Sequence, residues 1–239
     1  MRPVVLLPSL GRPAGDFDRL VADLAAHGRH AVAVDLPGVA SAADRPVGPD
    51  LHAVANEVAG RIASLGPSIH LVGHALGNRV ARCLAADRPG RVASLTLLGC
   101  GGKVPGDSDA QDALLRCFTE EPGSAAHLDA VATAFFAPDQ PVPRAWATGW
   151  WPEAAAAQGR AARSTPWEGW WVPPEPVPVL AVVGRQDRIS PPANAEDLVA
   201  RVGERGRLAV VDDAGHALLP ERPDHLAEAV TGWLDDVDP

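Results

Sequence analysis

The chain has 239 residues and a formal net charge of −9, with 21 lysines and arginines against 30 aspartates and glutamates. This length suits one domain with an insertion and is sufficient for a substantial core. The acidic balance argues against a nucleic-acid partner, which would require a basic surface. No segment is long and apolar enough to span a bilayer, and no signal-peptide pattern follows Met1. We therefore expect a cytoplasmic protein of bacterial type with no membrane partner.

Six apolar runs alternate with amphipathic helical patterns along the chain. The runs cover residues 3–7, 30–36, 69–72, 92–98, 177–183 and 208–211. Such alternation predicts a mostly parallel sheet covered by helices on both faces. Ligand chemistry is then expected at the carboxyl ends of the strands.

Residues 71–86, LVGHALGNRVARCLAA, pass from a buried strand through a sharp turn into a helix. Gly73 and Gly77 flank Ala75 at the spacing of a nucleophile elbow, in which small residues let the strand and the helix approach closely. The elbow pattern has a nucleophile where this chain has Ala75, whose methyl group can neither attack a substrate nor accept a proton. Asn78 and Arg79 open the helix, where we expect them to cap it or to form local pairs.

The alternation of strands and helices stops between residues 103 and 176. We therefore predict a core formed by residues 1–102 and 177–239, and a helical cap formed by residues 103–176. The cap region holds six of the seven tryptophans. Because indole rings combine a large apolar area with one hydrogen-bond donor, we expect some of them to line a substrate pocket. The substrate-binding candidates among them are Trp146, Trp150, Trp151 and Trp170.

Two later loops carry the other residues of a catalytic constellation. Asp187 follows the fifth predicted strand and His216 follows the sixth, in the order expected behind an elbow. Asp212 and Asp213 are the alternative partners for His216 if Asp187 points away. The three cysteines have no CxxC spacing, and no clustered His/Cys signature predicts a metal site, so no metal or organic cofactor is implied.

The whole chain resembles the α/β-hydrolase superfamily. PSLG is similar to its oxyanion-hole loop, GHALG to its elbow, GRQDRISPP to its acid loop and AGHALLPERP to its histidine loop. The resemblance implies that Leu10 and Leu76 offer backbone N–H groups to an oxyanion, that Asp187 orients His216, and that the insertion is a lid. PSLGR, GHAxGNRVAR and GGKVP further resemble a bacterial branch with alanine at the elbow.

The chain departs from the family pattern at its start, which leaves no room for the usual N-terminal hairpin. The strand at residues 30–36 is then expected at an edge of the sheet, covered either by the chain itself or by the second subunit of a homodimer.

Three hypotheses account for Ala75. In the first, alanine is native, and His216 acts as a general base on a small, largely apolar carbonyl metabolite while two amides stabilise the oxyanion. Cyclisation, isomerisation, C–C cleavage and direct hydrolysis all remain open. In the second, the chain is an inactive Ser→Ala variant of a serine esterase. In the third, it is a binding receptor of the same fold.

Ser9 and His74 are further candidates for contact with the substrate. Ser9 precedes the predicted oxyanion amide, where it either orients a ligand or stabilises its turn. His74 precedes the elbow residue, where it either reaches the site or packs against the loops.

Overall fold

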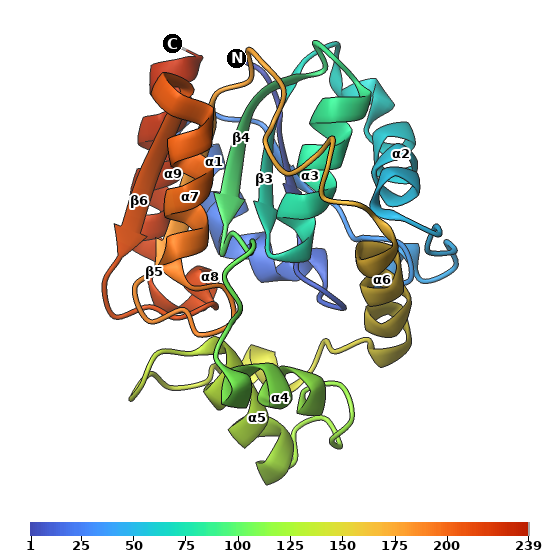
Figure 1. Ribbon diagram of the computed structural model, residues 1–239, viewed down its shortest axis with the longest axis vertical. Coiled ribbons are helices and arrows are strands. Elements are labelled where there is room, and N and C mark those ends of the chain that lie inside the picture. Colours follow the sequence, from blue (N-terminus) through green and yellow to red (C-terminus); the bar gives the residue numbers. More distant parts are fainter. Residues whose placement is uncertain (239) are drawn as a thin grey trace.

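The computed structural model describes residues 1–238 and shows a six-stranded, all-parallel sheet between two layers of helices (Figure 1). The strands are β1 (Val4–Leu7), β2 (Ala31–Ala33), β3 (Ile69–His74), β4 (Val92–Leu98), β5 (Val179–Gly184) and β6 (Gly206–Val211). This architecture confirms the predicted fold class and the predicted number of strands. Strand β2 is shorter than predicted because it has a neighbour on one side alone, and its ladder ends where Val34 N–H donates to Leu6 O.

The strand order is β2-β1-β3-β4-β5-β6, so β2 lies at an edge as predicted. The chain moves outward from β1 to β2 and then crosses back to β3, which makes the boundary between β1 and β3 a topological switch point. Leu7 at the end of β1 is in register with Gly73 near the end of β3. The loop after β1 and the turn after β3 therefore emerge side by side.

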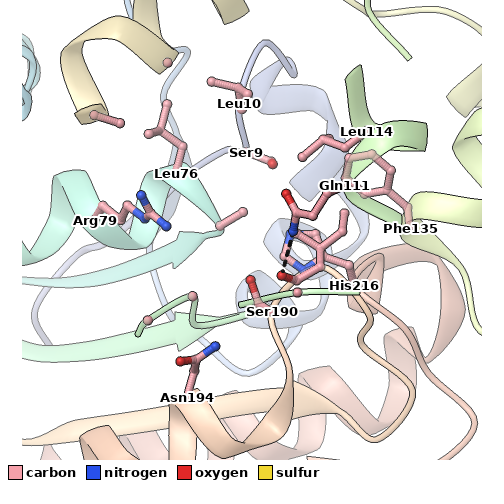
Figure 2. Close-up of a pocket in the computed structure, with 18 of the residues that line it drawn as sticks. Ser9, Leu10, Leu76, Arg79, Gln111, Leu114, Phe135, Ser190, Asn194 and His216 are labelled. Atoms are coloured by element: carbon pink, nitrogen blue, oxygen red, sulfur yellow. Dashed lines mark hydrogen bonds between the residues drawn. The ribbon is translucent and has the colours of Figure 1, made fainter. Parts of the chain in front are cut away.

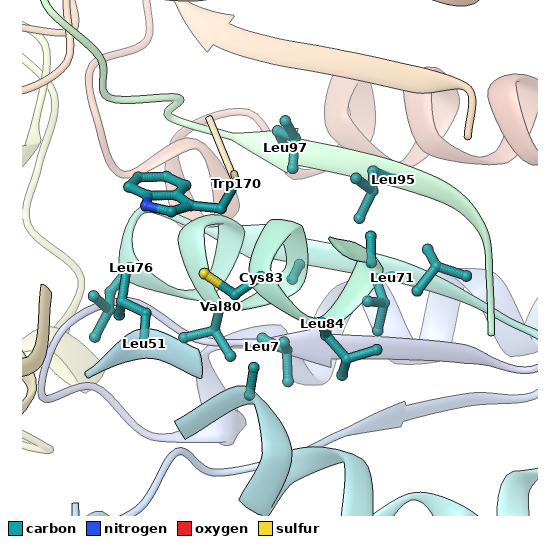
Figure 3. Close-up of a cluster of buried hydrophobic side chains, with 14 of the residues drawn as sticks. Leu7, Leu51, Leu71, Leu76, Val80, Cys83, Leu84, Leu95, Leu97 and Trp170 are labelled. Atoms are coloured by element: carbon teal, nitrogen blue, oxygen red, sulfur yellow. The ribbon is translucent and has the colours of Figure 1, made fainter. Parts of the chain in front are cut away.

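Alternate residues of the strands supply two separate cores, as expected for side chains that point to opposite faces. Val4 and Leu6 pack under α1 (Asp18–Ala26) and α9 (Pro223–Val237). Val5 and Leu7 belong to the larger core on the other face (Figure 3). The helices of that face are α2 (Leu51–Arg61), α3 (Leu76–Asp87) and α7 (Pro192–Val202).

The segment between β4 and β5 is helical, as predicted, and its two parts pack differently. The helices are α4 (Ser108–Arg116), α5 (Ala125–Phe135) and α6 (Pro152–Ser164). Helices α4 and α5 lie beyond the carboxyl ends of the strands, away from the sheet, and share a small apolar cluster of their own (Figure 1). Residues 167–171 instead pack against the main core beside α3. The cap predicted for residues 103–176 is thus divided between a roof over the strand ends and a part of the core.

Short helical turns complete the chain. They are the 3₁₀ turns Ala14–Phe17, Ala40–Ala42, Ala63–Leu65, Arg144–Ala147 and Gly203–Arg205, and the one-turn helix α8 (Leu218–Glu221). Within residues 1–238, no helix combines the length and the apolar character needed to cross a membrane.

Candidate active site

The turn between β3 and α3 has the strained backbone of an elbow. Ala75 adopts φ 49° and ψ −106°, a conformation rare for a residue with a Cβ atom. Such a residue costs about 1–3 kcal/mol and persists where the surrounding structure enforces it. The Ala75 N–H donates to Leu98 O at 2.9 Å, which fixes the turn to the end of β4.

Two glycines allow the close packing that enforces this turn. A Cβ atom on Gly77 would lie 2.1 Å from Leu7 O, and one on Gly73 would lie 2.4 Å from the backbone nitrogen of Asn78. Real Cβ atoms do not approach backbone atoms so closely. The first turn of α3 therefore contacts the end of β1 directly, and only glycine fits between them.

Asp187 and His216 lie together at the carboxyl ends of the adjacent strands β5 and β6. His216 Nδ1 is 2.8 Å from Asp187 Oδ2, and both side chains are buried. The other carboxylate oxygen, Asp187 Oδ1, accepts the Ser190 N–H at 2.7 Å. The predicted pairing of acid and histidine is thus present as a contact.

The alternative acids point elsewhere. Asp212 pairs with Arg185, and Asp213 lies 3.6 Å from Arg222. Gly99, at the end of β4, packs against the histidine ring, since a Cβ atom there would lie 2.9 Å from His216 Cε1.

Hydrogen bonds from several directions fix the backbone around His216. The His74 Nε2–H donates to His216 O at 2.8 Å. Burial, together with the nearby His216, lowers the pKa of His74 to about 3, so this ring is neutral at ordinary pH. His74 does not line the cavity as predicted, because its position at the buried end of β3 turns the ring toward the histidine loop.

Glu221 on α8 ties the histidine loop to the end of α5. Its carboxylate accepts the Gly215 N–H at 2.8 Å and the Ala137 N–H at 2.7 Å. Ala217 N–H donates to Phe135 O at 2.8 Å and adds a direct backbone link. Burial raises the pKa of Glu221. The sequence analysis missed this residue because its partners lie 6 and 84 positions away.

A cavity of about 590 Å³ opens beside the elbow and the histidine (Figure 2). Five predicted site residues line it: Ser9, Leu10, Ala75, Leu76 and His216. Within residues 1–238, the N–H groups of Leu10 and Leu76 donate no hydrogen bond, so both are available to a ligand. Apolar side chains from the roof and the acid loop complete the walls, namely Leu114, Leu115, Phe118, Phe135 and Ile189.

No tryptophan of the described residues lines this cavity, which corrects the prediction for Trp146, Trp150, Trp151 and Trp170. Trp146 and Trp150 instead pack on the Arg12 guanidinium, whose carbon lies 4.5 and 4.4 Å from their ring centroids. These contacts are cation–π interactions, which favour the broad indole face.

The other two tryptophans also have structural contacts. Trp170 lies in the main core (Figure 3), and with Trp171 it packs on the Arg82 guanidinium, whose carbon lies 4.9 and 4.6 Å from the two ring centroids. Trp151 is the N-cap residue of α6, and its N–H donates to Gly11 O at 3.1 Å. The Trp151 backbone therefore supports the loop that carries Ser9 and Leu10.

The cavity also contains polar residues to which the sequence analysis gave no role in the site. Arg79, Gln111, Arg163, Ser190 and Asn194 all line it. Asn78 pairs locally, which is one of the two roles expected, because its side-chain amide donates to Leu98 O at 3.2 Å and its oxygen accepts from Arg82 at 2.8 Å; it does not cap the helix. Arg79 forms no such pair within residues 1–238, contrary to expectation.

The described residues, 1–238, contain no group of three or more His, Cys, Asp or Glu side chains placed to hold a metal ion.

Comparison with known proteins agrees with this fold. The family model for the alpha/beta hydrolase family matches residues 4–229. No curated protein sequence matches the chain significantly. Among solved structures, a malate-bound thermophilic esterase from Thermogutta terrifontis has a TM-score of 0.78 and 25% identity over 100% of this chain and 91% of its own.

Two further solved structures share the fold. A bacterial membrane phospholipase A has a TM-score of 0.76 and 25% identity, with coverage of 99% of this chain and 79% of its own. An esterase from Exiguobacterium antarcticum has a TM-score of 0.79 and 20% identity, with coverage of 98% and 92%.

Proposed function

This chain belongs to the alpha/beta hydrolase family, and we propose that it is an enzyme that works without a covalent intermediate. The solved structures that resemble the chain are mostly those of hydrolytic enzymes. In this proposal His216, oriented by Asp187, is the general base. The backbone N–H groups of Leu10 and Leu76 form the oxyanion hole. The substrate is a small metabolite that contains a carbonyl group.

The observation that carries the proposal is the 2.8 Å contact between His216 Nδ1 and Asp187 Oδ2 beside the cavity. A carboxylate accepts hydrogen bonds and donates none, so the proton of a neutral imidazole resides on Nδ1. The other ring nitrogen, Nε2, then carries the lone pair that accepts a proton. An inert pocket would have no need of a buried carboxylate behind this ring.

The second element of the proposal is a pair of main-chain donors next to the base. Leu10 follows β1 and Leu76 follows β3, two strands paired in register, and both residues line the cavity, which supports this assignment. Negative charge that develops on a carbonyl oxygen is strongly stabilised by such fixed donors in a site that excludes water.

Ala75 decides which chemistry is available. Its methyl group cannot form an acyl-enzyme, so His216 must withdraw the proton from water, from a substrate hydroxyl or from a carbon beside the carbonyl. These three routes correspond to direct hydrolysis, cyclisation, and isomerisation or C–C cleavage.

A second candidate is a serine esterase in which alanine has replaced the nucleophile. It is favoured by the backbone of Ala75, which keeps the φ of 49° of an elbow although no nucleophile needs to be presented. The codon for residue 75 in the unmodified gene separates the two candidates, because a serine codon would end the non-covalent proposal.

The experiment is a screen of carbonyl metabolites with product detection by mass spectrometry, followed by variants. We expect His216→Gln to abolish conversion and Ala75→Ser to leave it largely intact, because no step uses the side chain at position 75. Conversion without His216, or a covalent acyl adduct on the unsubstituted chain, would contradict the proposal.

A fluorophosphonate probe tests the same geometry without a known substrate. The unsubstituted chain should remain unlabelled, whereas Ala75→Ser should become labelled. The double variant Ala75→Ser/His216→Gln should lose that labelling, since the hydroxyl then has no base to activate it.

A further inference from the structure

The cavity beside His216 has a charge balance opposite to that of the chain. The protein has 30 acidic residues against 21 basic ones, yet no Asp or Glu of the described residues lines the cavity. Arg79 and Arg163 both line it. Asp187 lies behind the histidine ring and does not reach the cavity wall. The site therefore presents cationic groups to its ligand within an otherwise acidic protein.

Half-buried Arg79 differs from the fully buried Arg12, Arg29 and Arg82 because none of its guanidinium N–H groups has a partner among the described residues. Arg12 binds Asp16, Arg29 binds Asp235 and Asp238, and Arg82 donates to Asn78 and to Trp171 O. Within residues 1–238, Arg79 has neither a salt bridge nor a hydrogen bond.

The contact that Arg79 does make is with an aromatic ring. Its guanidinium carbon lies 5.5 Å from the ring centroid of Trp167. Burial lowers the pKa of Arg79, which reflects the cost of removing its charge from water without a counter-ion. A cation that is shielded from solvent in this way is stabilised by an anion that enters the cavity.

Beside Gly101, Arg79 shares the cavity wall with a second donor, the Ser190 hydroxyl. A Cβ atom on Gly101 would lie 3.1 Å from Arg79 Nη2 and 3.2 Å from Ser190 Oγ. The missing side chain at position 101 thus leaves room between a guanidinium and a hydroxyl, both of which face the cavity (Figure 2). Arg79 follows Ala75 by one helical turn, so this polar end lies on the same side of α3 as the elbow.

We propose that the ligand of this cavity carries a carboxylate, which binds Arg79 and Ser190 at the Gly101 gap while its carbonyl group lies against the Leu10 and Leu76 amides. The planar guanidinium matches a carboxylate with two parallel hydrogen bonds. The apolar wall formed by Leu114, Phe118 and Phe135 receives the rest of the molecule. The substrate class is therefore an apolar oxo acid, which narrows the small, largely apolar carbonyl metabolite expected from the sequence. The position of the reacting carbonyl rests on the proposed function, whereas the carboxylate site does not.

The test compares two probes that differ in charge and have nearly the same shape, 3-phenylpropionate and 3-phenylpropionamide, by isothermal titration calorimetry. We expect the carboxylate to bind the unsubstituted protein about 10- to 100-fold more tightly, as for a hydrogen bond to a charged group. Arg79→Met should remove this preference and leave the amide affinity unchanged, whereas Arg79→Lys should retain part of it. Arg185→Met, at an exposed arginine outside the cavity, is the matched control and should change neither affinity.

Equal binding of the two probes by the unsubstituted protein, or no measurable binding of the carboxylate, would overturn the inference. A carboxylate preference that persists in Arg79→Met would also overturn it. His216→Gln separates this result from the proposed function, because we expect this variant to lose turnover and to keep the carboxylate preference. Loss of the preference in His216→Gln would assign the anion to the imidazole and overturn the role of Arg79.

Discussion

Replacing Asp187 with asparagine should move the proton of the neutral His216 ring from Nδ1 to Nε2 without removing a buried contact. The two carboxylate oxygens accept from two donors, the His216 ring at 2.8 Å and the Ser190 N–H at 2.7 Å. An asparagine offers one oxygen and one NH₂ group, so it cannot accept from both. If its oxygen faces the ring, its NH₂ group faces the Ser190 N–H, and two buried donors oppose each other. If its oxygen faces Ser190, its NH₂ group donates to His216 Nδ1 and forces the ring proton onto Nε2.

The size of the effect follows from two costs. A buried donor left unsatisfied costs about 1–3 kcal/mol, so the orientation that protonates Nε2 is favoured by about 5- to 150-fold. Loss of the carboxylate also removes the stabilisation of the imidazolium that forms when the base accepts a proton. That stabilisation is about 4 kcal/mol for opposite charges about 4 Å apart near a protein surface, or about a thousandfold in rate. We therefore expect Asp187→Asn to lower kcat by about four to five orders of magnitude.

The tautomer can be measured without a substrate. Long-range ¹H–¹⁵N correlation spectra at about pH 9, where an ordinary imidazole is neutral, distinguish protonation at Nδ1 from protonation at Nε2. The His216 signals are assigned by their absence in His216→Gln, and Asp212→Asn serves as the control because Asp212 pairs with Arg185 instead. A His216 ring that stays protonated at Nδ1 in Asp187→Asn would refute the reasoning.

Two further predictions concern stability. Gly77→Ala should lower the free energy of unfolding by at least about 3 kcal/mol in urea titrations, because the new Cβ atom would lie 2.1 Å from Leu7 O and neither backbone can yield. Gly60→Ala is the matched control and should stabilise by about 0.5–1 kcal/mol, since nothing lies within 4 Å of its Cβ position on helix α2. An unchanged midpoint in Gly77→Ala would show that the elbow is less tightly packed than described. Burial alone would raise the pKa of Asp238, yet the Arg2 N–H and neighbouring cations lower it to about 2. Asp238 should thus stabilise the fold at neutral pH, and this contribution should fade as the pH falls from about 4 through 2. Comparison of acid-unfolding curves with Asp238→Asn checks this, because the variant should lack that part of the pH dependence.

The fold was predictable because its central strands β1, β3, β4 and β5 are buried on both faces and therefore appear as continuous apolar runs. Strand 92–98 was predicted at the residues where it is observed. Edge strand β2 was predicted too long, because the residues that follow it remain apolar although they leave the sheet. The packing of residues 167–171 against α3 could not be predicted, since it depends on the buried Arg82, which lies far away in the sequence.

The site was predictable where backbone position decides it and unpredictable where side-chain direction decides it. Asp187 and His216 follow neighbouring strands, so chain order alone brings them together, and their catalytic role stays a prediction. The tryptophans lie in irregular segments, where no helical or strand periodicity of the sequence indicates the direction of a side chain. Arg79 could have been suspected, because it follows Ala75 by one turn of a helix that starts at the elbow.

The hydrogen bonds that join the histidine loop to the end of α5 limit how this protein can admit a ligand. Ala217 N–H binds Phe135 O, and Glu221 bridges Gly215 to Ala137, so swinging this end of the roof away would pull the imidazole from Asp187. Ligand exchange at that side would thus break the His216–Asp187 contact each time. Entry is expected instead past Val104 and Arg163, exposed residues of the cavity lining that take no part in these hydrogen bonds, so that a ligand can come and go while the contact is kept.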